Sequence, residues 1–383
     1  MRLWSILVVS LSRVKKVYMS RFIFYSAILV ASISTLLFIN SHYLQALSIH
    51  LTDITTIINT PNILTSQHNL TPDTNNHIKE QDHMSNRAAA SAAKTMAKST
   101  PLRHAKITAH RSAARGHADH GWLNTHHSFS FAGWHHPDHT HFGALRVLNE
   151  DRVRARSGFP THPHRDFEIF SYVLSGELTH RDSMLSKGNE GGQSDKFYRM
   201  GRGDVQFTTG GTGIAHSEMN EHERDTVHFL QIWAIPWKRG LQPRYHTRSF
   251  GDDYKRRGFV SILSPLKGGV DATAQQERDA EPTIPGTIPI HADMAMGAGI
   301  IAPGAEGFEW VVGAKATEAA KRKVYVHLPM TKAGKARIRI DGREDVELGE
   351  GDGAYVDAVN AGDKLVIESI GDAEAEVIVL DTA

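Results

Sequence analysis

The chain contains no cysteine among its 383 residues, which excludes several kinds of site at once. Without thiols there is no disulfide, no thiolate zinc site, no iron–sulfur cluster and no cysteine nucleophile. An excess of charge is missing too, because 43 Lys and Arg residues face 42 Asp and Glu and leave a formal net charge of +1. We therefore expect no direct binding of nucleic acid through bulk electrostatics. Long apolar periodic runs are few, and a composition of 40% hydrophobic and 22% charged residues excludes a polytopic membrane protein and a wholly disordered chain.

The first hundred residues differ in composition from the rest of the chain. Residues 22–39 form an uncharged, mostly apolar run behind several basic residues, with the length of a short transmembrane helix. Residues 40–100 are rich in Thr, Asn, Ser, His, Ala and Lys, which is typical of a disordered linker. Three interpretations stay open: a start placed too early, with the true start at Met84 or Met96; a membrane anchor or secretory signal; or a targeting presequence. The first predicts a cytoplasmic or nuclear protein, and an anchor predicts a membrane-bound one.

Beyond residue 100 the sequence predicts short strands separated by glycine and aspartate turns. Phe167 to Leu174 is β-branched and aromatic and ends at Ser-Gly, so we expect a strand that forms a hairpin with residues 177–182. A Gly-Asp turn precedes a strand at both Asp204 and Asp352, which indicates an internal duplication. Short strands with turns about every 8–12 residues indicate an all-β sandwich or barrel. Further strands are expected at residues 144–149, 205–208, 226–236, 294–301, 323–328, 336–340, 354–356, 364–369 and 376–380.

Histidine is the most informative residue type, since 15 of the 24 histidines lie between His117 and His246. His162 and His164 are two positions apart, and alternate residues of a strand project to the same face. His216 and Glu218 repeat this spacing after a glycine-rich turn. On neighbouring strands the two pairs would bring together three imidazoles and one carboxylate. Such a set suits a divalent first-row metal: iron, manganese, cobalt, nickel, copper or zinc.

These motifs resemble those of the pirin family of bicupins, and the quercetinase-like pirins in particular. The resemblance runs from about Gly116 to Ala383 and is strongest in Gly158–Arg165 (GFPTHPHR) and Gly211–Glu218 (GTGIAHSE). It implies an all-β fold of two tandem cupin barrels, that is, double-stranded β-helices of jelly-roll type. The expected organisation is a disordered extension at residues 1–100, a metal-binding domain at residues 104–250 and a metal-free domain at residues 251–383.

The resemblance also implies which residues hold the metal. His162, His164, His216 and Glu218 are the expected ligands, with Fe²⁺ as the usual metal and other divalent transition metals as alternatives. Glu168 stands where the general cupin pattern has its carboxylate ligand, and it shares the strand parity of His162 and His164. We expect Glu168 to face the pocket behind the ligands, with direct ligation as the alternative.

The function implied by the resemblance is that of a quercetin 2,3-dioxygenase. A flavonol and dioxygen would be the substrates, Glu218 would take the proton of the flavonol hydroxyl, and carbon monoxide would leave when the ring opens. The alternative is a non-enzymatic, iron-dependent, redox-sensing transcriptional co-regulator that binds a transcription factor, as nuclear pirin does. In either case we expect a monomer.

Other histidines and aromatic residues have two interpretations each. The histidines at 126, 127, 135, 136, 139 and 141 could bind an auxiliary metal, but a polar loop near the pocket mouth is the plainer interpretation. His291 and His327 are isolated and are expected to be structural. Four aromatic residues could stack on an aromatic ligand or pack in the core: Trp122, Phe129, Phe131 and Trp134.

Overall fold

The computed structural model describes residues 101–184, 197–313 and 321–383. The extension expected at residues 1–100, with its apolar run at 22–39, lies outside the described residues. None of the helices within the described ranges combines the length and the apolar character that crossing a bilayer requires.

The strands of the first half form two sheets. One sheet has seven strands in the order β12-β9-β6-β11-β4-β3-β2, and the other has four in the order β5-β10-β7-β8. The bounds of these strands are β2 (Gly116–Asp119), β3 (Leu123–His127), β4 (Leu145–Val153), β5 (Ser157–His164), β6 (Glu168–Ser175), β7 (Leu178–Asp182), β8 (Tyr198–Met200), β9 (Asp204–Thr209), β10 (Ile214–Asn220), β11 (Val227–Ala234) and β12 (Arg244–Ser249).

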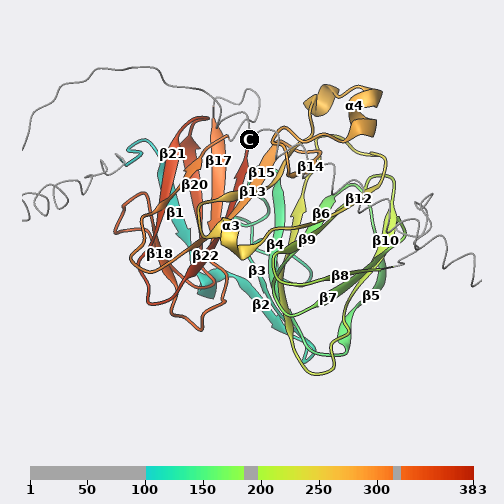
Figure 1. Ribbon diagram of the computed structural model, residues 1–383, viewed down its shortest axis with the longest axis horizontal. Helices are drawn as coiled ribbons and strands as arrows, with labels where there is room; N and C mark the ends of the chain where they lie inside the picture. The colour runs from blue at the N-terminus through green and yellow to red at the C-terminus, as the bar shows by residue number, and fades with distance from the viewer. Residues whose placement is uncertain (1–100, 185–196, 314–320) are drawn as a thin grey trace, which may run out of the picture. The chain divides into compact units, whose positions relative to one another are not determined.

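The second half repeats this arrangement with another pair of sheets. Its seven-stranded sheet has the order β1-β20-β17-β22-β15-β13-β14, and its four-stranded sheet has the order β16-β21-β18-β19. The bounds are β1 (Lys106–His110), β13 (Val260–Pro265), β14 (Ile288–Ile290), β15 (Met294–Ile301), β16 (Phe308–Val311), β17 (Arg322–His327), β18 (Arg337–Ile340), β19 (Glu347–Gly349), β20 (Gly353–Val359), β21 (Lys364–Ser369) and β22 (Ala375–Thr382). Figure 1 shows the green and yellow strands of the first half beside the orange and red strands of the second.

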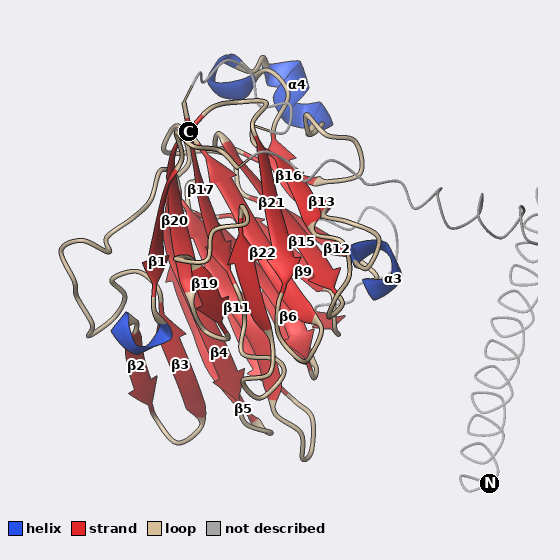
Figure 2. Ribbon diagram, turned by 90° about the vertical axis from the view of Figure 1, so that its left-hand side faces the viewer, coloured by secondary structure: helices blue, strands red, loops and turns tan. Residues whose placement is uncertain are grey.

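Helices are short and lie at the edges of the sheets, as Figure 2 shows for α3 and α4. Helix α3 spans Asp252–Lys255, and helix α4 spans Ala274–Asp279. Thr273 caps α4 by accepting a hydrogen bond from the backbone N–H of Gln276, whose side chain caps in return. Among the described residues, Ser112–Ala114 and Gly269–Asp271 form 3₁₀ turns. The described residues therefore form an all-β fold, as the sequence predicted.

Three apolar clusters hold the sheets together. In the first half, Leu178 and Met200 of the four-stranded sheet pack with Val173 and Phe229 of the seven-stranded sheet. An equivalent cluster fills the second half and includes Ile338. Each pair of sheets thus encloses its own core, as expected for a cupin barrel.

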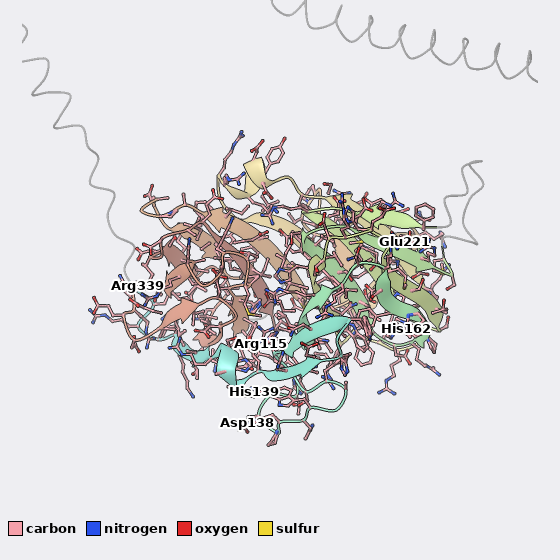
Figure 3. The ribbon with its side chains drawn as sticks, turned by 90° about the horizontal axis from the view of Figure 1, so that it is seen from below. Arg115, Asp138, His139, His162, Glu221 and Arg339 are labelled. Carbon is pink, nitrogen blue, oxygen red and sulfur yellow. The ribbon has the colours of Figure 1, made fainter. Side chains whose placement is uncertain are left out.

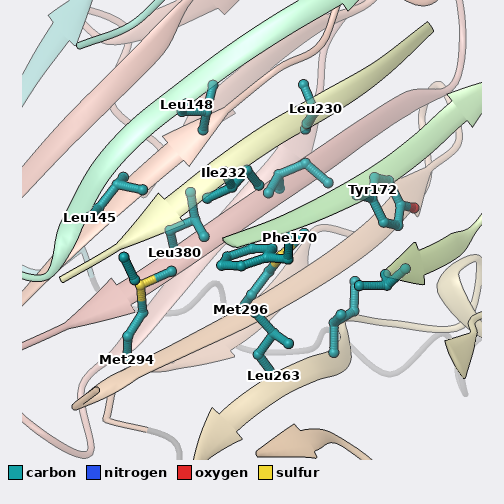
Figure 4. Packing of buried hydrophobic residues seen from close by; sticks show 14 of the residues in the cluster. Leu145, Leu148, Phe170, Tyr172, Leu230, Ile232, Leu263, Met294, Met296 and Leu380 are labelled. Atoms are coloured by element: carbon teal, nitrogen blue, oxygen red, sulfur yellow. The ribbon is translucent and has the colours of Figure 1, made fainter. Parts of the chain in front are cut away.

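The third and central cluster joins the two seven-stranded sheets. Figure 4 shows Leu148 and Ile232 from β4 and β11 packed with Met296 and Leu380 from β15 and β22. These side chains are all buried, and such apolar burial contributes about 25 cal/mol per Å². The two halves therefore share a continuous hydrophobic interface rather than a flexible connection.

Two details of the topology differ from the sequence-based expectation. The predicted hairpin of residues 167–174 with 177–182 is wrong, because β6 pairs with β9 and β11 while β7 pairs with β8 and β10. The chain crosses from one sheet to the other at Gly176, whose φ of +78° suits a sharp corner. Strand β1 precedes the first half in sequence but pairs with β20 of the second half, with Lys106 opposite Asp357.

Candidate metal centre

Three histidines from two adjacent strands converge at one point of the first four-stranded sheet. Strand β10 pairs with β5 in antiparallel register, with His216 opposite His162 and Ile214 opposite His164. The three ring centroids form a triangle whose sides are each 4.7 Å, with interplanar angles between 67° and 81°. One ligand nitrogen from each ring lies within 4.8 Å of the others. Three steeply inclined imidazoles around one point form a facial set of donors.

The strand geometry explains why these side chains meet. His162 and His164 alternate along β5 and therefore share a face, while Pro163 between them projects to the other side. On β10 the register with β5 shifts between His216 and Glu218 at an irregularity of the pairing. Gly158 lies opposite Met219 at this point, and it leaves no room for a Cβ, which would come 2.3 Å from the carbonyl oxygen of Glu218.

The protonation of the histidines suits metal binding. Burial lowers the pKa of His164 to about 4, with a smaller contribution from His162, and burial holds the pKa of His216 far below its ordinary value. Both rings are therefore neutral at pH 7, as metal ligands must be. His162 Nδ1 lies 2.8 Å from the carbonyl oxygen of Pro160, which can only accept. The proton of a neutral His162 is thus on Nδ1, and Nε2 carries the lone pair.

The spacing of the nitrogens fits an ion. His162 Nε2 and His216 Nε2 are 3.1 Å apart. Two nitrogens bound to one ion at about 2.0–2.1 Å lie about 2.8–3.0 Å apart in octahedral geometry and about 3.3–3.4 Å apart in tetrahedral geometry, and the observed distance falls between these ranges. The residues present therefore fit a first-row divalent metal.

Glu218 lies on the same strand but is held by other groups. Its side chain is buried, with Oε1 accepting a hydrogen bond of 2.7 Å from Ser171 Oγ and Oε2 accepting one of 2.6 Å from Gln231 Nε2. Its carboxylate oxygens do not belong to the group of three histidine nitrogens within 4.8 Å. Burial raises the pKa of the Glu218 carboxyl, while the hydrogen bonds from Ser171 and Gln231 oppose the shift.

Glu168 is directed elsewhere in the structure. Its buried carboxylate accepts hydrogen bonds through Oε2 from Thr209 Oγ1, at 3.1 Å, and from the backbone N–H of His291, at 3.4 Å. His291 also lies 2.9 Å from Glu277 through Nε2. His327, the other histidine expected to be structural, places its Nε2 3.2 Å from Glu150 Oε2. Glu168 thus connects β6 to the segment after β14.

A second group of buried polar side chains shares His216 with the histidine triangle, and the sequence analysis did not predict it. His180, Asp182 and His216 are all buried and place one ligand atom each within 4.8 Å of the others. The spacing of His180 and Asp182 on β7 repeats that of His162 and His164, so the signal was present in the sequence. Only the pairing of β7 with β10 shows that both pairs meet at His216.

An aromatic pocket of about 330 Å³ opens beside the histidines. Its lining includes Phe131, Trp134, Phe167, Trp233 and the guanidinium-bearing Arg146. The ring centroid of Trp233 lies 4.9 Å from that of His164, edge to face, so the indole separates the histidine from the pocket.

The four aromatic residues singled out from the sequence divide between the two interpretations. Phe131 and Trp134 line the pocket, whereas Phe129 is fully buried in the central cluster and Trp122 packs on Phe159. The histidine-rich segment divides as well. His135 lines the pocket beside Phe131 and Trp134, whereas His139 stacks on His110 with centroids 4.3 Å apart, and Figure 3 shows His139 well away from His162.

Comparisons with known proteins agree with this geometry. The Pirin family model matches residues 108–234. A protein of Escherichia coli named quercetin 2,3-dioxygenase is 43% identical over 151 residues, which are 39% of this chain and 60% of that protein. The match thus spans three fifths of the length of this curated relative.

Solved structures extend the similarity to both halves of the chain. The crystal structure of YhhW from Escherichia coli is 32% identical, with a TM-score of 0.57, and the match covers 73% of this chain and 98% of that one. The structure of the bacterial pirin YhhW from Escherichia coli in complex with nickel(II) is 31% identical, with a TM-score of 0.56 and coverage of 72% and 99%.

Proposed function

Since the chain belongs to the pirin family, we propose that it is a metal-dependent dioxygenase that opens the ring of a flavonol such as quercetin. The observation that carries the proposal is the facial triangle of three imidazoles at His162, His164 and His216. A relative named quercetin 2,3-dioxygenase supports the reaction. We propose Fe²⁺ as the metal, and a relative that binds nickel(II) supports a site that accepts other divalent ions as well.

The residues around the triangle have distinct tasks in this reaction. A bound divalent ion would acidify the flavonol 3-hydroxyl and offer open positions to the substrate and dioxygen. Glu218 takes the hydroxyl proton, and Ser171 and Gln231 hold its carboxylate in place. The flavonol takes up both atoms of dioxygen, its heterocycle opens, and carbon monoxide leaves. We also propose that Glu218 is a fourth metal ligand and that Glu168 is a buried group behind the ligands.

The aromatic pocket supports an aromatic substrate. Trp233 lies edge to face against His164, and Phe131 and Phe167 pack on Trp233. These rings give the pocket aromatic walls on which planar rings stack favourably. The guanidinium of Arg146, whose Nη1 donates to the carbonyl oxygen of Ser130, adds positive charge to the same pocket. A polyphenol bound through its chelating oxygens could place its remaining ring there.

Replacing Trp233 tests the pocket separately from the metal. For Trp233→Leu we expect KM for quercetin to rise about 2- to 10-fold, the equivalent of about 0.5–1.5 kcal/mol for an aromatic contact. Metal content should not change. Trp237→Leu, at an indole that packs on His291, is the matched control in steady-state kinetics. An unchanged KM in Trp233→Leu would place the substrate elsewhere.

We further propose that residues 104–250 form the metal-binding domain, apart from β1, which pairs with β20 in the second half. Residues 251–383 form a metal-free domain, and the protein acts as a monomer. Both groups of candidate metal ligands in the described residues fall between His162 and His216. The second domain contributes packing, through the central cluster and through the contact of Glu168 with His291.

The decisive experiment measures metal and turnover on one sample of the full chain. Metal content is determined by elemental analysis, and quercetin loss, oxygen uptake and carbon monoxide release are followed together. We expect one metal per chain and metal-dependent turnover, both lost in His162→Ala/His164→Ala and kept in His141→Ala, which alters an exposed histidine. Metal without turnover of any flavonol would contradict the dioxygenase and favour the redox-sensing co-regulator. A wild-type chain without metal would contradict the metal centre.

A further inference from the structure

The nitrogen of His216 that faces away from the triangle contacts another buried histidine. His216 Nδ1 lies 3.1 Å from His180 Nε2, with the two rings nearly perpendicular at 88°. His180 Nδ1 in turn lies 3.2 Å from the hydroxyl oxygen of Tyr245 on β12. The side chains of His180 and His216 are almost completely buried, at 0% and 1% exposure. A continuous hydrogen-bonded chain thus runs from the metal centre through three strands.

The chemistry of a neutral imidazole fixes the direction of this chain once a metal is bound. His216 Nε2 faces His162 Nε2 at 3.1 Å, so Nε2 is the nitrogen available to an ion. A neutral ring has one N–H and one lone pair, so the proton of His216 must then lie on Nδ1. That proton needs an acceptor in a buried environment, and His180 Nε2 is the atom within reach.

The same reasoning extends to the next ring. If His180 Nε2 accepts, its own proton lies on Nδ1 and donates to Tyr245 Oη. We propose that His180, held by Tyr245, is the positioning residue of this centre: it accepts the Nδ1 proton of His216 and so directs the Nε2 lone pair of His216 to the metal. This inference rests on the metal centre of the proposed function, and it assigns a role to two residues that touch neither the metal nor the substrate.

Asp182 does not compete for this role, and a second ion is not needed. Asp182 Oδ2 lies 4.0 Å from His216 Nδ1, beyond a hydrogen bond. Its two oxygens accept from Thr208 Oγ1 at 3.2 Å and from the backbone N–H of Met184 at 2.8 Å. The distance of 3.1 Å between His180 Nε2 and His216 Nδ1 is that of a single hydrogen bond, which needs no ion between the two nitrogens. We therefore assign the second group of ligands as support for His216, with one ion per chain.

The test combines metal affinity with direct detection of the proton. Zinc is the probe, since it is diamagnetic, and its affinity for the full-length protein is measured by competition with a chelator. We expect His180→Phe to weaken zinc binding about 10- to 100-fold, as removal of such a partner typically does. His180→Gln, whose amide oxygen can accept the same proton, should restore most of the affinity. Tyr245→Phe should cause a smaller loss.

The proton is observed in the wild-type protein by long-range ¹⁵N–¹H correlation of the zinc-loaded form. We expect His216 and His180 to carry their protons on Nδ1. His216 protonated on Nε2 would overturn the proposal, and so would wild-type zinc affinity in His180→Phe. If His180→Phe does not fold, the position of the His216 proton in the wild-type protein still decides the question. Two zinc ions per wild-type chain would overturn it as well.

These outcomes separate this inference from the proposed function. Zinc affinity and the position of the protons do not depend on flavonol turnover, so failure of the dioxygenase assay leaves them unaffected. A wild-type chain that binds no zinc contradicts the metal centre and, with it, the role of His180.

Discussion

At the scale of single residues, the candidate centre depends on hydrogen bonds that leave Nε2 of His162 and of His216 available to an ion. His162 donates its Nδ1 proton to the Pro160 carbonyl, and His216 contacts His180 through Nδ1. Both Nε2 atoms are thereby directed to the same point. The orientation and tautomer of these two rings are thus fixed by groups outside the triangle, which is the usual basis of a pre-arranged metal site.

The role of Glu218 can be tested with its amide. In Glu218→Gln the side chain can keep accepting from Gln231 and can donate to Ser171, whose hydroxyl can turn to accept. The fold should therefore tolerate the change, but the amide cannot take a proton. We expect kcat to fall about 100-fold or more, the usual contribution of a general base, with a smaller loss of metal affinity. Stopped-flow turnover and chelator competition measure the two effects.

An unchanged kcat in Glu218→Gln would contradict the proton-accepting role. Ser171→Ala is the comparison, since it removes one hydrogen bond and keeps the carboxylate that takes the proton, so its kcat should fall less than that of Glu218→Gln.

Residue spacing predicted which histidines gather but not their surroundings. The i, i+2 pairs at His162/His164 and His216/Glu218 place side chains on one face of each strand, and the three histidines do converge. Spacing could not show that β7 lies beside β10, so His180 remained undetected as a neighbour of His216. It also could not show that Ser171 and Gln231 hold the Glu218 carboxylate, because these residues lie on strands of the other sheet.

At the scale of elements, the site depends on how closely β5 and β10 approach each other. The irregular register between His216 and Glu218 brings the backbone of β10 against Gly158. A glycine at this position, with φ of +157°, lets the strands pair without a side chain between them. The positions of the ligands on both strands therefore depend on one residue that has no side chain.

We expect Gly158→Ala to disturb the centre from this distance. The added Cβ would lie 2.3 Å from the Glu218 carbonyl oxygen and 2.6 Å from Met219 Cα, so backbone must move. Such overpacking costs about 1–3 kcal/mol in the free energy of unfolding and should also weaken metal binding. Gly201→Ala is the control, because its Cβ would meet no atom within 4 Å. Urea unfolding and chelator competition compare the two, and equal behaviour would contradict this account.

The strands themselves were largely predictable, but their partners were not. Apolar and β-branched runs predicted β15 and β21 with their observed bounds, 294–301 and 364–369. The run Phe167 to Leu174 also became a strand, β6, shifted by one residue. Its expected hairpin is absent because a Ser-Gly corner joins two sheets here as readily as it would join two adjacent strands. Local sequence specifies extended backbone and turns, whereas sheet membership depends on distant strands.

At the scale of the whole molecule, a buried charged network connects the two halves. Tyr172 of β6 donates a hydrogen bond of 2.6 Å to Glu376 Oε1 of β22, and Lys255 Nζ lies 2.7 Å from Tyr172 Oη and 3.4 Å from Glu376. Arg202 approaches the other oxygen of Glu376 at 2.8 Å. Lys255 is fully buried, and its ammonium lies 2.9 Å from the Asp252 carboxylate and 3.4 Å from that of Glu376.

Removing the shared carboxylate should therefore destabilise the whole protein. In Glu376→Ala the buried Lys255 ammonium keeps Asp252 but loses Glu376, and Arg202 loses the same carboxylate. We therefore expect a loss toward the lower end of the range of about 3–5 kcal/mol that breaking a buried pair costs. The control is Glu309→Ala, which removes an exposed pair with Lys364 and should change stability by about 1 kcal/mol or less. Urea unfolding should show a single transition for both halves. A loss in Glu376→Ala no larger than in the control would contradict the structural role of the network.

Stability should also fall in acid because of buried neutral histidines. Burial lowers the pKa of His110 to about 3, and the nearby His139 and Arg115 contribute further. The unfolded histidine has a pKa of about 6.5, so between these values the unfolded chain binds one more proton than the folded chain. The free energy of unfolding then decreases as the pH falls through this window, by at most about 1.4 kcal/mol per pH unit for this group.

His110→Gln should make this acid dependence shallower. Glutamine can still hydrogen-bond the hydroxyl of Tyr325, which lies 3.0 Å from His110 Nδ1, but it does not titrate. Unfolding of metal-free protein at about pH 7 and about pH 5 measures the difference. An equal decrease in wild type and variant would show that His110 is not a source of the acid sensitivity.

The pairing of β1 with β20 has a consequence for biosynthesis. Lys106 lies near the beginning of the described residues, whereas its partner Asp357 is translated about 250 residues later. At about 5–20 residues per second, the ribosome needs roughly 12–50 seconds to bring the second strand out. Throughout this interval β1 has no sheet to join, although the strands of the first barrel can already pair. The nascent protein therefore carries β1 as an unpaired strand until β20 has been synthesised. Ribosome-bound chains ending before residue 353 should leave β1 accessible to protease.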